Sequence, residues 1–320
     1  MKELPDIYYK KEWGKLYSEK DNGFSEEYRL ENQYGTIIYP YIKRNIEQEP
    51  KYFDIITPYG FNGPMIVKSI NKQKLLESYE QDFNVYCQEN GIIAEYIRFS
   101  PWFKNHLDFS EFYNLKLNKK TIAMNLLVED ILMQEISAKR RNCIRSAIKN
   151  GVKIEFDFEG KTIDEFYKLY QNTIKKNEIK EYYWVSKEFL KKHFELLQNN
   201  VFIVNAIYEN KIISSSIFLH CNKQLHYHYS ANDYEYVNLN GNSLILYEVA
   251  KWGKQNGKER LNLGGASISD NLMKFKLSFT KDEGFDYYIG TRIRQEHIYN
   301  ELVKRTKKEN SKYFPKYRGE

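Results

Sequence analysis

The chain has 320 residues, a length that fits two domains of ordinary size or one large domain. Apolar residues make up 42% and charged residues 29%, which is the composition of a globular protein and excludes a disordered or collagen-like chain. The formal net charge of +6 is too small to indicate a nucleic-acid-binding protein, although a mild positive charge would attract a phosphate-bearing ligand.

The first half of the chain alternates between strand and helix patterns. A β-branched, aromatic stretch at 28–46 predicts a hairpin that turns at 32–35. Asn71 is a suitable N-cap for a helix, and Asn90-Gly91 follows its end. The helices expected here cover 8–19 and 71–88, and further strands are expected at 53–56, at 92–99 and near 121–128.

A basic helical segment follows at 132–149, where apolar positions alternate with lysines and arginines. Asn150-Gly151 is expected to end this helix, because glycine accepts the left-handed conformation found at many helix ends. The segment is not enriched in Gly, Pro or Ser, so it predicts a rigid joint between two domains, 1–130 and 131–320. Its basic residues fit a solvated surface and a phosphate contact equally well.

The second half shows a similar order of elements. Helices are expected at 163–177, 186–199, 243–255, 272–279 and 296–308, and strands at 201–208, 212–220, 224–230, 260–263 and 285–294. This order resembles that of an acyl-CoA N-acyltransferase (GNAT-type) domain. The expected fold class is therefore α+β, with two tandem GNAT-like domains whose mixed central sheets are flanked by helices.

The sequence also resembles the FemABX-like family of peptidoglycan-bridge aminoacyltransferases, over about residues 8–305. Four stretches carry the likeness: Glu95-Tyr96-Ile97-Arg98-Phe99-Ser100-Pro101, Arg141-Asn142-x-Ile144-Arg145-x-Ala147-x-x-Asn150-Gly151-Val152, Tyr227-His228-Tyr229-Ser230-Ala231, and Leu263-Gly264-Gly265 with Phe275-Lys276-Leu277-Ser278-Phe279. No long coiled-coil arm interrupts the second half, so the compact branch of the family is the better match.

The resemblance implies transfer of an acyl group, often an aminoacyl group from a charged tRNA, onto an amine of a cell-wall or surface-polysaccharide precursor. The donor would be an aminoacyl-tRNA or an acyl-CoA, with no permanently bound cofactor, and tRNA is a further candidate partner. Two alternatives stay open: an acyl-CoA-dependent N-acetyltransferase acting on an amino sugar, and a GNAT-like module that binds a glycan precursor or tRNA without catalysis.

Two residues are the catalytic candidates. Lys276 matches the family's functional lysine, and a fixed cation beside the carbonyl would stabilise the oxyanion of the tetrahedral intermediate. Tyr229 would lie where the central strands of a GNAT-like sheet separate, facing the acyl group. Tyr227 has the same parity on its strand and is expected to line the same face as a substrate contact.

The other candidates would bind substrate. Tyr96 matches a substrate-lining tyrosine, and Arg98 on the same strand face could hold a diphosphate through two hydrogen bonds. Lys15 supplies the basic residue that relatives carry after a tryptophan of the first helix. Arg141 and Arg145 could contact phosphates of a tRNA or a nucleotide sugar.

Two departures from the family pattern bear on the substrates. An arginine of relatives is expected near residue 182, where this sequence has Tyr182-Tyr183-Trp184, and this exchange favours an acceptor with less phosphate and more sugar or lipid surface. The turn at 237–243 has one glycine, whereas CoA-binding domains use a glycine-rich turn to hold pyrophosphate on backbone N–H groups. Asn242 or Ser243 could cap the following helix and offer N–H groups, but acetyl-CoA is expected to bind weakly.

The remaining sequence features indicate a cytoplasmic protein without stable membrane insertion. The chain shows no apolar leader and no apolar run of the roughly 18 residues that a spanning helix needs. Its three cysteines have no CxxC spacing. His226 and His228 share a strand face near Cys221, but no further ligand at a suitable spacing supports a metal site.

Overall fold

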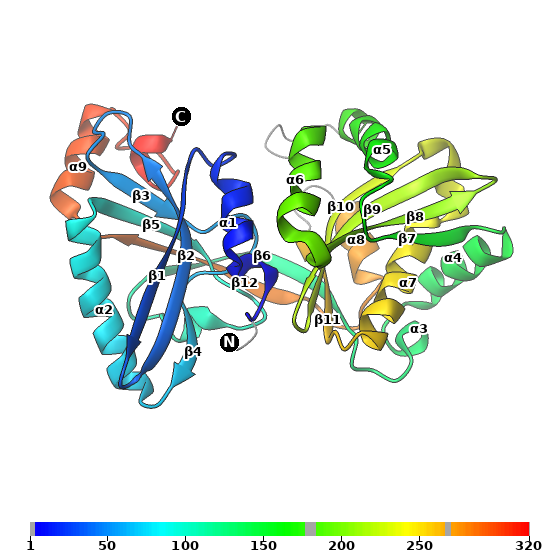
Figure 1. Cartoon of the computed structure of the whole chain (residues 1–320), viewed down its shortest axis with the longest axis horizontal. Coiled ribbons are helices and arrows are strands. Elements are labelled where there is room, and N and C mark those ends of the chain that lie inside the picture. The colour runs from blue at the N-terminus through cyan, green and yellow to red at the C-terminus, as the bar shows by residue number, and fades with distance from the viewer. Residues whose placement is uncertain (1–3, 177–183, 266–269, 320) are drawn as a thin grey trace. The chain divides into compact units, whose positions relative to one another are not determined.

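The computed structural model describes residues 4–176, 184–265 and 270–319, and the chain divides into two compact units (Figure 1). Unit 1 consists of residues 1–7 and 120–285, and unit 2 of residues 8–119 and 286–320. These units differ from the expected domains 1–130 and 131–320. The chain passes from one unit to the other at residues 119–120, and its C-terminal segment returns to unit 2.

Strand pairing and a buried ion pair explain this return. In unit 2, strand β12 (Phe285–Ile293) pairs antiparallel with β5 (Ile92–Arg98). The next residue, Arg294, has a fully buried side chain whose Nε lies 2.5 Å from Glu95 Oε1 and whose Nη1 lies 3.0 Å from both carboxylate oxygens of Glu80. A sequence-local argument cannot find such a return, because the two partners lie about two hundred residues apart.

Unit 1 has a mixed sheet with strand order β6-β11-β10-β9-β8-β7. All neighbouring pairs given for it are antiparallel except β10 with β11, which is parallel. Its strands are β6 (Asn114–Asn125, which begins in unit 2), β7 (Lys153–Asp157), β8 (Val201–Tyr208), β9 (Lys211–Cys221), β10 (Gln224–Asn232) and β11 (Arg260–Gly265). Its helices are α3 (Ile131–Gln134), α4 (Ala138–Lys149), α5 (Ile163–Lys176), α6 (Lys187–Leu197), α7 (Gly241–Gln255) and α8 (Asp270–Leu277).

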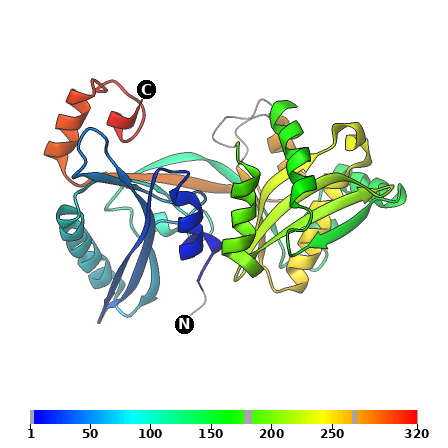
Figure 2. The ribbon, with the colours of Figure 1, turned by 45° about the horizontal axis from the view of Figure 1, so that its top comes forward.

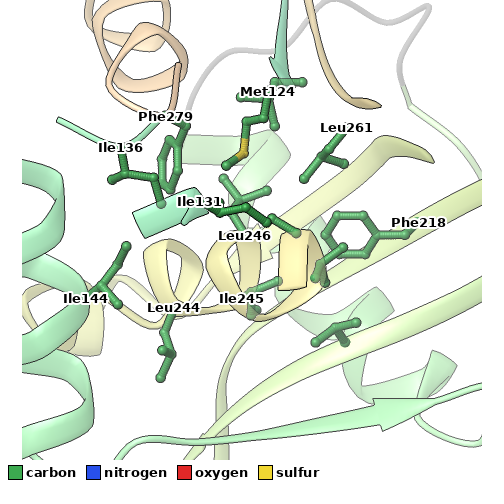
Figure 3. Packing of buried hydrophobic residues seen from close by; sticks show 14 of the residues in the cluster. Met124, Ile131, Ile136, Ile144, Phe218, Leu244, Ile245, Leu246, Leu261 and Phe279 are labelled. Atoms are coloured by element: carbon green, nitrogen blue, oxygen red, sulfur yellow. The ribbon is translucent and has the colours of Figure 1, made fainter. Parts of the chain in front are cut away.

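Helices cover both faces of this sheet. Figures 1 and 2 show α5 and α6 on one face, and α4 and α7 on the other. Figure 3 shows α7 crossing the centre of the core, where Leu244 lies toward Ile144 of α4 and Ile245 belongs to the same cluster. Each of these side chains is at most 2% exposed, and burial of one such side chain contributes roughly 1.5–3 kcal/mol. Helix α7 is therefore anchored firmly on this face of the sheet, against β8 and β9.

Unit 2 has strand order β1-β2-β3-β5-β12, with β4 paired to β2. Helices α1 and α2 lie on opposite sides of its first hairpin (Figure 1). Its further elements are α1 (Lys11–Ser18), β1 (Gly23–Asn32), β2 (Gly35–Asn45), β3 (Phe53–Ile56), β4 (Met65–Ser69), α2 (Lys72–Glu89) and α9 (Glu296–Arg305).

Most expected elements are present, with small shifts at their ends. The hairpin turns where the sequence indicates, since Asn32 pairs with Gly35, and Asn71 caps α2 by accepting a hydrogen bond from Lys74 N. The single basic helix expected over 132–149 is wrong. It is two helices, α3 and α4, because Ser137 caps a new helix by accepting from Arg140 N. Strands β4 and β7 were not expected.

Together the units give the expected α+β architecture of mixed sheets flanked by helices, and the described helices of unit 1 form no coiled-coil arm. Among the described residues, every helix is too short or too polar to cross a lipid bilayer.

Candidate active site

Two neighbouring strands of unit 1 separate at the middle of the sheet. Parallel strands β10 and β11 pair from Gln224 opposite Arg260 to His226 opposite Asn262. Beyond that point, in the described residues, β10 continues along β9 while β11 continues along β6. We call the opening between 227–232 and 263–265 the fork. Backbone N–H and C=O groups along separated strand edges need partners, so the fork suits an extended ligand.

A β-bulge in β10 determines which side chains point to each face at the fork. Tyr227 lies opposite Phe218 of β9, whereas Tyr229 lies opposite the adjacent Ile217, so His228 is an inserted residue. Since consecutive residues of β9 point to opposite faces, Tyr227 and Tyr229 also point to opposite faces. The expectation that both tyrosines line one face is therefore wrong. That expectation assumes that side chains alternate regularly between the two faces of the strand, and the extra residue at the bulge breaks this alternation.

Tyr227 contacts the first turn of α7. Its hydroxyl donates a hydrogen bond to Asn242 Oδ1 at 3.1 Å, and its ring packs at 5.5 Å from that of Phe218. Burial raises the pKa of the Tyr227 phenol, and hydrogen bonds from neighbouring side chains offset only part of this rise. The two predicted substrate-binding residues Tyr227 and Asn242 are thus brought together, and they bind each other.

Tyr229 lies on the face covered by α5 and α6, beside two histidines. Its ring centroid lies 4.1 Å from that of His228, 5.8 Å from that of His193 and 5.7 Å from that of Tyr170. His193 is fully buried, and its Nδ1 lies 2.9 Å from the carbonyl oxygen of Phe189, which can only accept. Nδ1 of His193 therefore carries the proton.

The two imidazoles also contact each other. His193 Nε2 lies 3.3 Å from His228 Nε2. When both rings are neutral, His193 Nε2 accepts and His228 Nε2 donates, so the lone pair of His228 lies on Nδ1. The sequence offered no signal for His193, which lies 35 residues before His228 on a different element. The sequence pattern indicates a chemical role for His228 only as a metal ligand.

Lys276 lies at the β11 side of the fork. Its side chain is 8% exposed, and Nζ donates a hydrogen bond to the carbonyl oxygen of Gly265 at 2.8 Å. Gly264 has φ +77°, and a Cβ placed there would lie 3.3 Å from Lys276 Nζ. Glycine thus gives the ammonium room to approach the backbone. Lys274, two residues earlier on α8, is exposed.

A second cation, Arg140, lies on the α7 face and is missing from the predicted site. Its Nη1 donates to Ser243 Oγ and its Nε to Ser278 Oγ, both at 2.9 Å. The guanidinium also lies over the rings of Phe275 and Phe279, at 4.5 and 5.2 Å. Burial lowers the pKa of Arg140, which stays a cation at neutral pH. Helical spacing alone did not distinguish Arg140 from its basic neighbours.

The two predicted arginines of α4, Arg141 and Arg145, do not share the contacts of Arg140 with Ser243 and Ser278. Arg141 Nη1 donates to the carbonyl oxygen of Ile136 at 2.7 Å, and Arg145 is exposed. The expected cap of α7 is also wrong. Asn240, with φ +58°, is the N-cap residue, and the side chains of Asn242 and Ser243 bind Tyr227 and Arg140 instead.

Three predicted residues belong to unit 2. The Arg98 guanidinium lies 5.5 Å from the Tyr96 ring centroid, and Nη1 donates to the carbonyl oxygen of Thr57 at 2.7 Å. Lys15 is exposed on α1. Burial raises the pKa of Tyr96, and the Arg98 charge opposes this rise. Burial also raises the pKa of the Asp21 carboxyl against the lowering effect of Arg98, and no motif in the sequence indicates Asp21.

The two histidines considered as metal ligands have different partners. His226 Nε2 lies 2.7 Å from Asp6 Oδ1, while His228 contacts His193. Among the described residues, no group of three or more His, Cys, Asp or Glu side chains could hold a metal ion. The predicted aromatic replacement at Tyr182 and Tyr183 lies outside the described residues.

Comparisons with known proteins agree with this architecture. Residues 136–276 match the family model described as an acetyltransferase (GNAT) domain. The fold is similar to a crystal structure of FemX, with a TM-score of 0.73 and 12% identity over 92% of this chain and 94% of that one. It is also similar to L-PGS from Bacillus licheniformis, with a TM-score of 0.54 and 12% identity over 91% and 93% of the two chains.

A tandem GNAT protein from the clavulanic acid biosynthesis pathway is a third similar structure, with a TM-score of 0.50 and 6% identity over 85% of this chain and 84% of that one. No curated protein matches the sequence. At these identities the structural likeness establishes the fold, and the expected tandem GNAT-like architecture is confirmed.

Proposed function

We propose that the protein is an acyltransferase of the GNAT type, because residues 136–276 match a model of the acetyltransferase (GNAT) domain and the fold is similar to that of FemX. Its reaction would transfer an aminoacyl or acyl group onto an amine of a cell-wall or surface-polysaccharide precursor. The observation that carries the proposal is the fork between β10 and β11, with Lys276 at one side and the pair His228–Tyr229 at the other. An extended donor lying in the fork would hydrogen-bond to the strand edges. The carbonyl carbon of its acyl group would then lie between Lys276 on one side and His228 and Tyr229 on the other.

The reaction requires stabilisation of negative charge. The acceptor amine attacks the ester or thioester carbonyl carbon, a C–N bond forms, and the carbonyl oxygen becomes an oxyanion. In this proposal the Lys276 ammonium would stabilise that oxyanion. One preorganised donor of this kind is worth roughly 3–4 kcal/mol in the transition state.

The reaction also requires removal of a proton from the attacking nitrogen. His228 Nδ1 would accept it, while the contact with His193 holds the His228 ring in one orientation. The C–O or C–S bond to the leaving group then breaks, and the proton goes to that oxygen or sulfur. The partly exposed ring of Tyr229, which packs edge to face with the buried ring of Tyr170, would provide an apolar contact for the acceptor, and aromatic rings suit the faces of a sugar.

The two candidate functions, aminoacyl transfer from tRNA and acyl transfer from coenzyme A, differ in the acyl donor. The position of Arg140 beside Ser243, in the first turn of α7, favours a donor that carries phosphate, and coenzyme A is one such donor. Against it, the turn at 237–243 that leads into α7 has one glycine, whereas a pyrophosphate held on backbone N–H groups is usually bound by a glycine-rich turn. We therefore favour an aminoacyl ester of tRNA and keep an acyl-CoA-dependent N-acetyltransferase as the second candidate. In unit 2, Tyr96, Arg98 and Lys15 remain candidates for binding the acceptor.

The experiment compares donors with the same enzyme. The protein is mixed with a lysine-containing muropeptide or an amino-sugar phosphate, and with either acetyl-CoA or an RNA minihelix that carries an alanyl ester. Mass spectrometry then measures the acylated acceptor. The proposal expects transfer from the ester and little from acetyl-CoA. Efficient transfer from acetyl-CoA would favour the second candidate, and no transfer from either donor would contradict catalysis by this fork.

A further inference from the structure

A buried chain of polar side chains lies where the fork begins. Asp6, His226 and Asn262 come from the N-terminal segment, β10 and β11, and their exposed fractions are 0%, 1% and 4%. His226 Nε2 lies 2.7 Å from Asp6 Oδ1, and His226 Nδ1 lies 3.1 Å from Asn262 Nδ2. His226 and Asn262 are also the last paired residues of the two parallel strands. The chain therefore links the strands at the point where they separate.

The direction of each hydrogen bond follows from its partners. Asp6 Oδ1 accepts from Ile7 N at 2.6 Å, so His226 Nε2 donates to the same oxygen. His226 Nδ1 is then the acceptor, and Asn262 Nδ2 donates to it. This orientation of the amide turns Asn262 Oδ1 toward β11, where it accepts from Gly264 N at 2.8 Å.

The last bond fixes an irregular piece of backbone. The register of β11 against β6 shifts between Asn262 and Gly264, and Gly264 adopts φ +77°. With its N–H turned toward Asn262, Gly264 leads into Gly265, whose carbonyl oxygen accepts from Lys276 Nζ. The chain thus runs from Asp6 through His226 and Asn262 to the backbone that holds the Lys276 ammonium.

We propose that Asp6, His226 and Asn262 are positioning residues that hold the Gly264–Gly265 backbone, and through it Lys276, in place for acyl transfer. This inference rests on the proposed function for the role of Lys276. The geometry of the chain itself does not depend on that role. A neutral imidazole is required because it must donate at Nε2 and accept at Nδ1 at the same time.

Two substitutions at one position separate positioning from packing. His226→Gln keeps one N–H donor and one oxygen acceptor, whereas His226→Leu fills a similar volume with neither. We expect His226→Gln to keep kcat within about threefold of the wild-type value. In His226→Leu, loss of the preorganised cation should lower kcat by about 10²-fold while KM changes little. Asn262→Ala interrupts the same chain from β11 and replaces His226→Leu if that variant does not fold.

A second readout does not depend on turnover. Leu263-Gly264 is the single Leu–Gly dipeptide of the sequence, so ¹³C-carbonyl leucine with ¹⁵N-glycine labelling isolates the Gly264 amide in one NMR signal. The wild type and His226→Gln should show a protected Gly264 N–H. In His226→Leu or Asn262→Ala, its hydrogen exchange should be at least tenfold faster.

The outcomes separate this inference from the proposed function. A folded His226→Leu or Asn262→Ala variant with an unchanged Gly264 amide, or with a loosened amide and unchanged kcat, would overturn the positioning role. If the wild type transfers no acyl group from any donor, the proposed function fails and the link to catalysis fails with it. The Gly264 signal would then still decide whether the hydrogen-bonded chain holds this backbone.

Discussion

The bulge at His228 has the largest consequence of any single residue in unit 1. One inserted residue places Tyr227 against α7 and Tyr229 against α5 and α6. It also separates the roles of His226, which binds Asp6, and His228, which contacts His193. Motif matching selected Tyr229 and Lys276 from the sequence. The bulge and its histidine pair could not be predicted, because alternation along a strand assumes a regular register.

His228 provides the prediction at this scale. His228→Gln should lower kcat by about 10²–10⁴-fold, the usual contribution of a general base, because glutamine cannot accept the proton of the attacking amine. The matched control is His220→Gln. His220 lies on β9 beside the rings of Phe202 and Trp252 and has no proposed catalytic role. Steady-state kinetics on both variants measures the difference, and similar kcat values for the two would remove His228 from the mechanism.

At the scale of helices and strands, the features that could be predicted are those that depend on neighbouring residues. Caps and turns depend on neighbouring residues, so Asn71, Ser186 and the turn at Glu209–Asn210 could be read directly from the sequence. Strand β8 was expected with its observed bounds. Strands β4 and β7 were missed because they are short and half-exposed, so their apolar pattern is weak. The fork depends on pairing between distant strands, which only the GNAT resemblance supplied.

Asp157 holds the loop that leads into α5 by accepting hydrogen bonds from Glu159 and Thr162. Its ionisation predicts a pH dependence of the stability of the fold. Burial opposes ionisation of its carboxylate, but hydrogen bonds from Thr162 N, Thr162 Oγ1 and Glu159 N outweigh it and lower its pKa. A folded-state pKa below the unfolded value stabilises the fold above about pH 4, and this contribution is lost as the pH falls through the folded-state pKa.

Asp157→Asn should therefore reduce the free energy of unfolding by about 1–2 kcal/mol at pH 7 and by less at pH 3. Urea denaturation at both pH values measures this difference. Asp164→Asn, in the exposed first turn of the same helix, is the control and should change stability by less than about 0.5 kcal/mol. An equal loss for Asp157→Asn at the two pH values would contradict the role given to its ionised form.

At the scale of the whole chain, the domain boundaries were the least predictable feature. Composition shows no break at residues 119–120, where the chain crosses between units within β6. The return of residues 286–320 to unit 2 depends on β12 pairing with β5 and on buried charges that no local pattern reveals. The tandem GNAT-like architecture was still predictable, because it was inferred from the order of helices and strands along the chain. That order is the same whichever unit the terminal segments join.

The ion pair of Arg294 tests how tightly the C-terminal segment stabilises unit 2. Arg294→Met would leave the fully buried Glu95 carboxylate without its cation, and breaking a buried pair from one side typically costs about 3–5 kcal/mol. Arg292→Met is the control, because Arg292 is 37% exposed and pairs with Glu80 at 2.8 Å. Its loss should cost about 1 kcal/mol or less. Denaturant unfolding followed by tryptophan fluorescence measures both, and equal stabilities would contradict the assignment.

The central claim is that the Lys276 ammonium stabilises the oxyanion in the fork, and kcat of Lys276→Met measured beside Lys274→Met tests it most directly. Two residues apart on α8, the two lysines point about 200° away from each other, and only Lys276 is buried. Methionine keeps most of the apolar length of lysine, so both variants should melt close to the wild type. The account predicts a loss of about 10²–10³-fold in kcat for Lys276→Met alone. Wild-type kcat in both variants would contradict it.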